Sequence, residues 1–257
     1  MRSTLTHRPG VAGTDRSGRI PEASHPGRSS DALGGRTLTL RDILDRLGPV
    51  PAWRVRSDPA PGLATEADCG ALNARGGRFE LFDGILLEKD VGFLESEIAL
   101  NLSTSVKNYL RGNNLGRVGG ADGFLRLRPD QTRGPDTSII RWDRLPGGVM
   151  PTDAVPAVAP TIAAEVLSRG NTEEEMARKI ADYFAAGTEL VWCIDPRTRT
   201  VAVHVSAAGQ PVVLREERGD VLTAGDLLPG FALPLAELFA LPDPPASPAS
   251  PDAGPRV

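Results

Sequence analysis

Two short stretches, GPDTSIIRW (134–142) and TIAAEVLS (161–168), decide the fold and the candidate site of this chain. Each is an apolar run rich in strand-forming residues, and each carries one acid: Asp136 at the start of the first run and Glu165 in the middle of the second. A lone carboxylate on a core strand is costly unless it is paired, protonated or bound to a metal ion. The two acids are therefore candidates for a functional site.

The composition indicates a globular protein with one domain of moderate size. The chain has 257 residues, 40% hydrophobic and 24% charged, which is enough to form a core without disulfide or metal support. The net charge of −4 argues against a broad basic surface for nucleic acid, although not against a local basic cleft. Two cysteines and three scattered histidines argue against a zinc site or a histidine-based triad. No segment reads as a signal peptide or membrane span, so we expect a cytoplasmic protein.

The chain is expected to have one main domain with extensions at both ends. Residues 1–36 and the Pro/Ala/Ser-rich residues 241–257 contain few apolar side chains, and we expect both to be disordered tails. Residues 37–74 predict a helical N-terminal extension, whose first helix has Thr39 as a plausible N-cap. Residues 75–240 predict the main domain.

Strands and helices alternate within the main domain. Asp83-Gly84 lies between two apolar alternations, which predicts a β-hairpin. Residues 93–116 and 171–187 each predict a helix. This order indicates an α/β domain with a mixed sheet. The other apolar runs predict strands at 122–130 and 135–142, expected to be neighbours, and at 161–168, 189–196, 200–205 and 211–216.

Other charged residues could join Asp136 and Glu165. Glu95 falls on the apolar face of the first helix, and Lys179 flanks the core-facing stripe of the second. Lys179 could reach the carboxylate of Glu165, or extend to the surface instead. Paired carboxylates without cysteine or histidine suit Mg²⁺, which polarises phosphoryl oxygens and lowers the pKa of a bound water. A neighbouring lysine could activate that water or stabilise developing charge, so the set suits phosphodiester hydrolysis.

The same residues carry a family resemblance. GPD (134–136) followed by AEVLS (164–168) resembles the Pro-Asp…(Asp/Glu)-x-Lys signature of the restriction-endonuclease-like nucleases. The order and spacing of further motifs across residues 75–240 resemble one bacterial branch of that superfamily, the Uma family. These motifs are FELFDG (79–84), EVLSRG (165–170), RKIADYFAAGTELVWCIDP (178–196) and LLPGFALPLAELF (227–239).

The resemblance implies a restriction-endonuclease-like core, that is, an α/β fold with a central mixed sheet flanked by helices. It implies that Asp136 and Glu165 are catalytic and hold Mg²⁺, with Mn²⁺ as a substitute. The superfamily signature has lysine two residues after the second acid, where this chain has Leu167. The resemblance therefore points to Lys179, on the following helix, as the catalytic lysine.

Auxiliary roles are open to several other residues. The resemblance suggests Glu95 as an auxiliary acid and Glu80 as a weaker candidate, because Glu80 could serve the hairpin instead. Glu95 could also pair with a nearby lysine or arginine, and Asp136 could be an acid that caps a turn. Candidates for a basic rim along a phosphate backbone, which could equally be solvated charges at strand edges, are Arg126, Arg128, Arg133 and Arg141.

We therefore expect a Mg²⁺-dependent endonuclease acting on nucleic acid, with DNA favoured over RNA and a homodimer compatible with the superfamily. The alternative is a catalytically inactive nuclease-fold module that serves as a binding or scaffold protein. The acidic net charge and the lack of lysine two residues after Glu165 favour that alternative. A third interpretation is a phosphatase or RNase that uses the same carboxylates.

Overall fold

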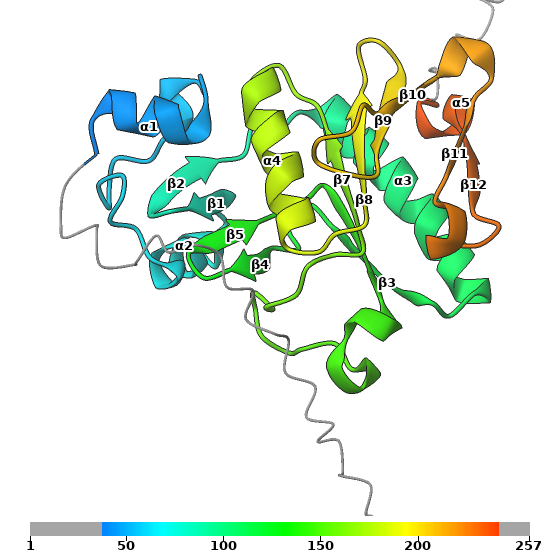
Figure 1. Cartoon of the computed structure of the whole chain (residues 1–257), viewed down its shortest axis with the longest axis horizontal. Coiled ribbons are helices and arrows are strands. Elements are labelled where there is room, and N and C mark those ends of the chain that lie inside the picture. The colour runs from blue at the N-terminus through cyan, green and yellow to red at the C-terminus, as the bar shows by residue number, and fades with distance from the viewer. Residues whose placement is uncertain (1–37, 242–257) are drawn as a thin grey trace, which may run out of the picture. The chain divides into compact units, whose positions relative to one another are not determined.

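Three β-sheets and the helices packed on them make up residues 38–241, the part of the chain that the computed structural model describes (Figure 1). All these elements belong to one compact unit. The tails expected at residues 1–36 and 241–257 lie outside the described residues, apart from Leu241. None of the described helices is both long and apolar enough to cross a membrane.

The central sheet has six strands in the order β10-β9-β8-β7-β6-β3. All neighbouring pairs are antiparallel except β7 and β8, which run parallel and are joined through helix α4 (Glu173–Ala185). The sheet is therefore mixed, which confirms the fold class expected from the sequence. Its strands are β3 (Gly116–Gly120), β6 (Thr137–Arg141), β7 (Ile162–Val166), β8 (Leu190–Asp195), β9 (Thr200–His204) and β10 (Val212–Arg215).

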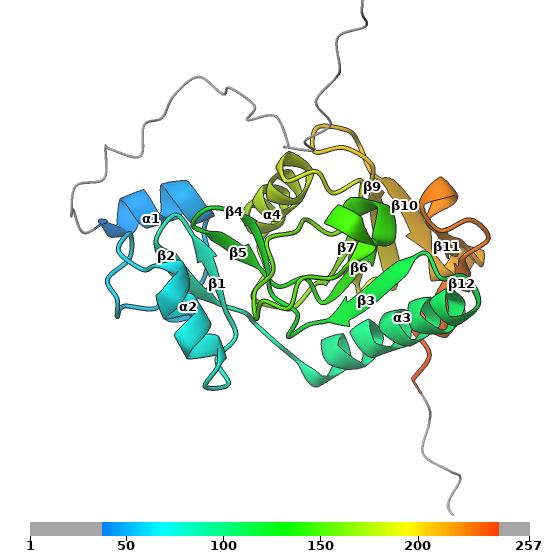
Figure 2. The same ribbon diagram turned by 90° about the horizontal axis from the view of Figure 1, so that it is seen from below.

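Helices cover both faces of this sheet. Helix α3 (Phe93–Gly112) lies on one face and α4 on the other (Figure 2). Side chains on β7 alternate between the two faces, as a strand requires: Ala164 packs in the core beneath α3, whereas Ala163 packs against α4.

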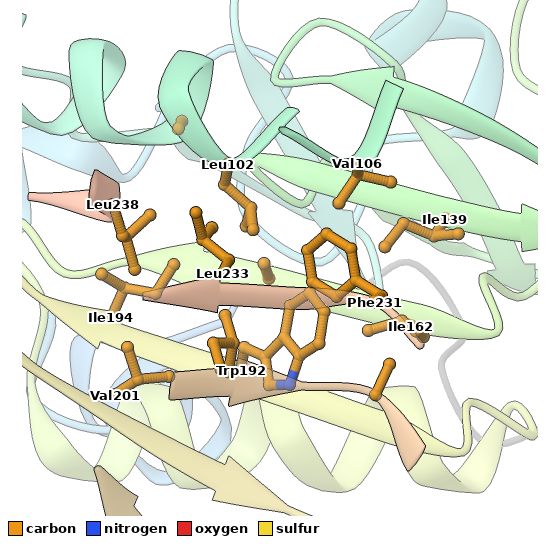
Figure 3. Close-up of a cluster of buried hydrophobic side chains, with 14 of the residues drawn as sticks. Leu102, Val106, Ile139, Ile162, Trp192, Ile194, Val201, Phe231, Leu233 and Leu238 are labelled. Atoms are coloured by element: carbon orange, nitrogen blue, oxygen red, sulfur yellow. The ribbon is translucent and has the colours of Figure 1, made fainter. Parts of the chain in front are cut away.

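The main core lies on the α3 face (Figure 3). The ring of Trp192 stacks on that of Phe231, with centroids 6.3 Å apart, and leucines of α3 and of the C-terminal elements surround them. These C-terminal elements are the two-stranded sheet of β11 (Val221–Thr223) and β12 (Ala232–Pro234), and helix α5 (Leu235–Leu238).

A second sheet has four strands in the order β2-β1-β5-β4. Asp83 and Gly84 form the predicted hairpin turn, with φ of 46° and 76°, because a two-residue type I′ turn needs positive φ at both positions. Helix α1 (Leu40–Leu47), capped by Thr39 as expected, packs on this hairpin together with α2 (Glu66–Asn73). The strands are β1 (Phe79–Phe82), β2 (Ile85–Glu88), β4 (Leu125–Arg128) and β5 (Gln131–Arg133).

One predicted pairing is wrong. The strands at 122–130 and 135–142 are not neighbours, since β4 belongs to the four-stranded sheet and β6 to the central sheet. Asp130, with a φ of 57°, lies in the turn that folds β5 back onto β4. Strand β3 (GRVGG) was not predicted, because a glycine-rich run has no apolar alternation. Short 3-10 turns complete the fold at Ala52–Arg54, Trp142–Arg144, Pro146–Gly148, Glu216–Arg218 and Gly225–Leu227.

Candidate nuclease site

Of the two acids that drew attention in the sequence, Glu165 lies on β7 and Asp136 immediately precedes the neighbouring strand β6. Strands β6 and β7 pair antiparallel, with Thr137, the residue after Asp136, opposite Ala164, the residue before Glu165. Like charges on neighbouring strands repel each other. Burial raises the pKa of Glu165; the charge of Lys179 opposes this rise and the charge of Asp136 adds to it. The fold therefore brings two carboxyl groups together.

Asp136 is held by a lysine that the sequence analysis did not identify. Its Oδ1 accepts a hydrogen bond of 2.9 Å from Lys89 Nζ, and its Oδ2 accepts one of 2.8 Å from the Val166 backbone N–H. Lys89 Nζ also donates to the carbonyl oxygen of Gly134 at 2.5 Å. Lys89 directly follows β2, and no local pattern in the sequence marks it. The one indirect signal is Leu167, which stands where the superfamily signature has lysine. The lysine of the site therefore has to come from elsewhere in the chain.

Glu165 is held from helix α4. Its Oε1 accepts a hydrogen bond of 2.5 Å from the Tyr183 hydroxyl, and its Oε2 lies 3.4 Å from Lys179 Nζ. Lys179 is only 3% exposed, so it does not extend to solvent. The amine of Lys179 also lies 3.2 Å from Glu80 Oε2. Lys179 therefore bridges two of the acids named from the sequence.

Glu80 lies in the interior rather than in an open site. Its Oε2 accepts a hydrogen bond from Arg133 at 3.0 Å, and its Oε1 accepts one from the Gly134 N–H at 3.2 Å. Burial opposes ionisation of Glu80, but the charges of Lys179, Arg133 and Lys89 outweigh it and lower its pKa to about 2. Arg133 in turn pairs with Asp182 at 2.5 Å. The result is a buried layer of alternating charges behind Asp136; its members are Asp182, Arg133, Glu80, Lys179 and Glu165.

A cleft of about 790 Å³ opens in front of Asp136. Its walls include the N-terminal part of α3 and the edge strand β3, and the bonded pair of Lys89, just after β2, and Asp136, just before β6, also lines it. Glu95, in the first turn of α3, lines the same cleft. Glu165, Lys179 and Glu80 do not line it and lie behind it. A substrate in this cleft would therefore meet Asp136, Lys89 and Glu95.

The four arginines proposed for a basic rim do not share one surface. Arg133 is buried between Glu80 and Asp182, so it has no access to a phosphate backbone in this arrangement. The other three each pair with a carboxylate, and Arg141 lies on the central sheet rather than the four-stranded one. These pairs are Arg126 with Glu66 at 2.8 Å, Arg128 with Asp83 at 3.1 Å, and Arg141 with Asp143 at 2.7 Å.

The donor set fits a hard cation that needs few protein ligands. Within residues 38–241, no group of three or more His, Cys, Asp or Glu side chains forms a ligand cluster. Mg²⁺ is commonly bound through one or two carboxylates, with waters and substrate phosphate oxygens completing its shell. Asp136 opens onto the cleft and Glu165 is buried behind it, so these two would be the carboxylates to hold such an ion.

The fold is an α/β domain with a central mixed sheet flanked by helices. The structure resembles a putative nuclease belonging to DUF820 from Anabaena variabilis, with a TM-score of 0.55 and 21% sequence identity over 63% of this chain and 89% of that chain. Residues 67–236 match the model of the Uma2 family, described as "Putative restriction endonuclease". The chain therefore belongs to the Uma2 family, which places it among nucleases that act on nucleic acid. No curated protein matches the chain significantly.

Proposed function

We propose that this protein is a Mg²⁺-dependent endonuclease that hydrolyses phosphodiester bonds, in DNA rather than RNA, with Asp136 and Glu165 holding the metal ion. The observation that carries this proposal is the placement of two neighbouring carboxyl groups, Asp136 on the wall of a cleft and Glu165 behind it on β7, with a lysine beside each of them. Two neighbouring like charges destabilise a sheet unless cations offset them, and a bound metal ion would do so together with the two lysines. The family description supports DNA as the substrate.

The side chains of this chain would share the work as their positions allow. A bound Mg²⁺ would polarise a phosphoryl oxygen and lower the pKa of a water molecule. Lys89 presents its amine in the cleft next to Asp136, where a positive charge would stabilise the negative charge that develops on the phosphate. Lys179 is buried behind Glu165 and would hold that carboxylate ionised and oriented. Glu95 on the cleft wall is the candidate auxiliary acid.

The test is cleavage of supercoiled plasmid, and of single-stranded DNA and RNA, with Mg²⁺ or with a chelator. We expect Asp136→Asn, Glu165→Gln and Lys89→Met each to lower the rate by roughly 10²–10³-fold, as for the loss of one electrostatic stabiliser. Lys107→Met is the matched control, because Lys107 lines the same cleft from α3. Full cleavage by Asp136→Asn would refute the proposal. A homodimer would suit cleavage of both strands of a duplex, and sedimentation velocity of the full chain measures it.

One observation favours the second candidate, an inactive nuclease-fold scaffold. Each of the four carboxylate oxygens of Asp136 and Glu165 already has a partner within the protein. The same contacts would be present in an inactive domain in which Asp136 and Glu165 have a purely structural role, with Asp136 binding Lys89 and Glu165 binding helix α4. That candidate predicts that the wild-type protein neither binds Mg²⁺ nor cleaves any of the three substrates.

A further inference from the structure

Arg54 lies outside the part of the chain that matches the family, yet it is one of the most buried side chains among the described residues. It ends the 3-10 turn Ala52–Arg54, before the matched residues 67–236, and is 1% exposed. Its two terminal nitrogens pair with the two carboxylate oxygens of Glu175, both at 2.9 Å. Such a bidentate pair fixes the guanidinium in both position and orientation.

The same guanidinium also binds two backbone carbonyls. Its Nε donates to the Glu88 carbonyl oxygen at 2.8 Å, and one terminal nitrogen donates to the Gly170 carbonyl oxygen at 3.1 Å. Glu88 is the last residue of β2 and immediately precedes Lys89. Gly170 lies in the loop between β7 and α4, and its N–H donates to Asp90 Oδ2 at 2.8 Å. The end of β2 and this loop are therefore tied to each other directly and through Arg54.

Each segment that Arg54 joins leads to a residue of the candidate site. The end of β2 leads to Lys89, the loop follows the strand that carries Glu165, and Glu175 lies one helical turn before Lys179. The end of β2 is distant in sequence from the loop and from the helix that follows it, and Arg54 contacts all three at once.

We propose that Arg54 is a positioning residue of the nuclease site, so that the extension before the family domain is part of the working enzyme. Arg54 holds the end of β2 against the β7–α4 loop, and this keeps the Lys89 amine within hydrogen-bond distance of Asp136. The expected effect of Arg54 on catalysis rests on the proposed function. Its expected effect on the geometry of the site does not.

The test has to separate positioning from stability. Replacing Arg54 alone would leave the Glu175 carboxylate buried without its cation, which destabilises any fold. The double variant Arg54→Met/Glu175→Met removes both charges, and apolar replacement of a buried pair is often neutral for stability. It also removes both bonds to the backbone carbonyls. Arg199→Met/Glu216→Met is the control, because that ion pair joins the turn before β9 to the 3-10 turn Glu216–Arg218 without contacting the site segments.

Two readouts are made on the full chain: amide hydrogen exchange at Lys89 and Val166, and kcat and KM for nucleic-acid cleavage. We expect the Arg54/Glu175 double variant to exchange at these amides about tenfold faster, because local opening becomes easier there. Its kcat should fall roughly 10–10²-fold with KM little changed, as a small misplacement of catalytic groups produces. The control pair should change neither readout.

Wild-type exchange rates at Lys89 and Val166 in the double variant would overturn the inference. If the wild-type protein cleaves no nucleic acid, the proposed function fails, and the exchange rates alone decide the role of Arg54. If the double variant does not fold, Arg54→Lys replaces it: lysine keeps the charge beside Glu175 but cannot also reach both carbonyls. Faster exchange in Arg54→Lys supports the inference, and unchanged exchange overturns it.

Discussion

Replacing Lys179 by methionine tests the balance of charge in the buried layer behind Asp136. The Lys179 amine lies 3.2 Å from Glu80 Oε2 and 3.4 Å from Glu165 Oε2, and the side chain is 3% exposed. Methionine is about as long as lysine but carries no charge. The substitution therefore keeps most of the packing and removes the cation that two buried carboxylates share.

The expected loss of stability follows from these contacts. Removing one partner of a buried ion pair costs about 3–5 kcal/mol. Glu80 would keep Arg133 and the Gly134 N–H, so most of the loss falls on Glu165, which would keep only the Tyr183 hydroxyl. A domain of this size loses about 2–4 °C in Tm per kcal/mol, which gives a fall of roughly 6–20 °C.

Urea and thermal unfolding followed by far-ultraviolet circular dichroism measure this loss. Lys107→Met is the matched control: it removes an exposed lysine of α3 and should change the free energy of unfolding by no more than about 0.5 kcal/mol. Lys179→Met/Glu165→Gln should recover part of the loss, because the stranded charge is then removed as well. Equal stability of Lys179→Met and Lys107→Met would show that Lys179 does not neutralise the buried acids.

Three further predictions concern other parts of the structure. The pKa of Glu80 is lowered to about 2, so this carboxylate stabilises the fold above its unfolded-state pKa, and the stabilisation is lost as the pH falls towards 2. In acid-denaturation curves, the difference in stability between the wild type and Glu80→Gln should therefore narrow between about pH 4.5 and pH 2. Burial raises the pKa of the Cys69 and Cys193 thiols to about 12, so neither should react with a thiol reagent at pH 8 until urea unfolds the chain. Gly84→Ala should lower the free energy of unfolding in urea by about 1–3 kcal/mol, because the φ of Gly84 is positive and a Cβ there would lie 2.6 Å from the backbone of Gly62. Gly76→Ala should lower it less, because Gly76 also has a positive φ but has open space around it.

Local signals in the sequence predicted the elements well. The Asp83-Gly84 turn, the Thr39 cap and the buried strand around Glu165 follow from turn chemistry, capping and apolar runs, each of which acts within a few residues. The acids of the candidate site were visible for the same reason: Asp136 and Glu165 each stand out against their own apolar run.

The partners of those acids could not be read from the sequence. Lys89 bonds to Asp136 across 47 residues and Arg54 to Glu175 across 121, and neither pair has a local pattern that marks it. The false pairing of the strands at 122–130 and 135–142 has a related cause. Which sheet a strand joins depends on long-range packing, and two apolar runs separated by a turn normally form a hairpin.

The most direct test of the nuclease account is calorimetric titration of Mg²⁺ and Mn²⁺ into the wild-type protein and into Asp136→Asn, with and without nucleic acid. Asp136 is the acid that opens onto the cleft, and Glu165 lies behind it on β7. The account predicts saturable binding to the wild type and none to Asp136→Asn at the same concentrations. Equal binding to both proteins, or none to the wild type even with nucleic acid present, would contradict it.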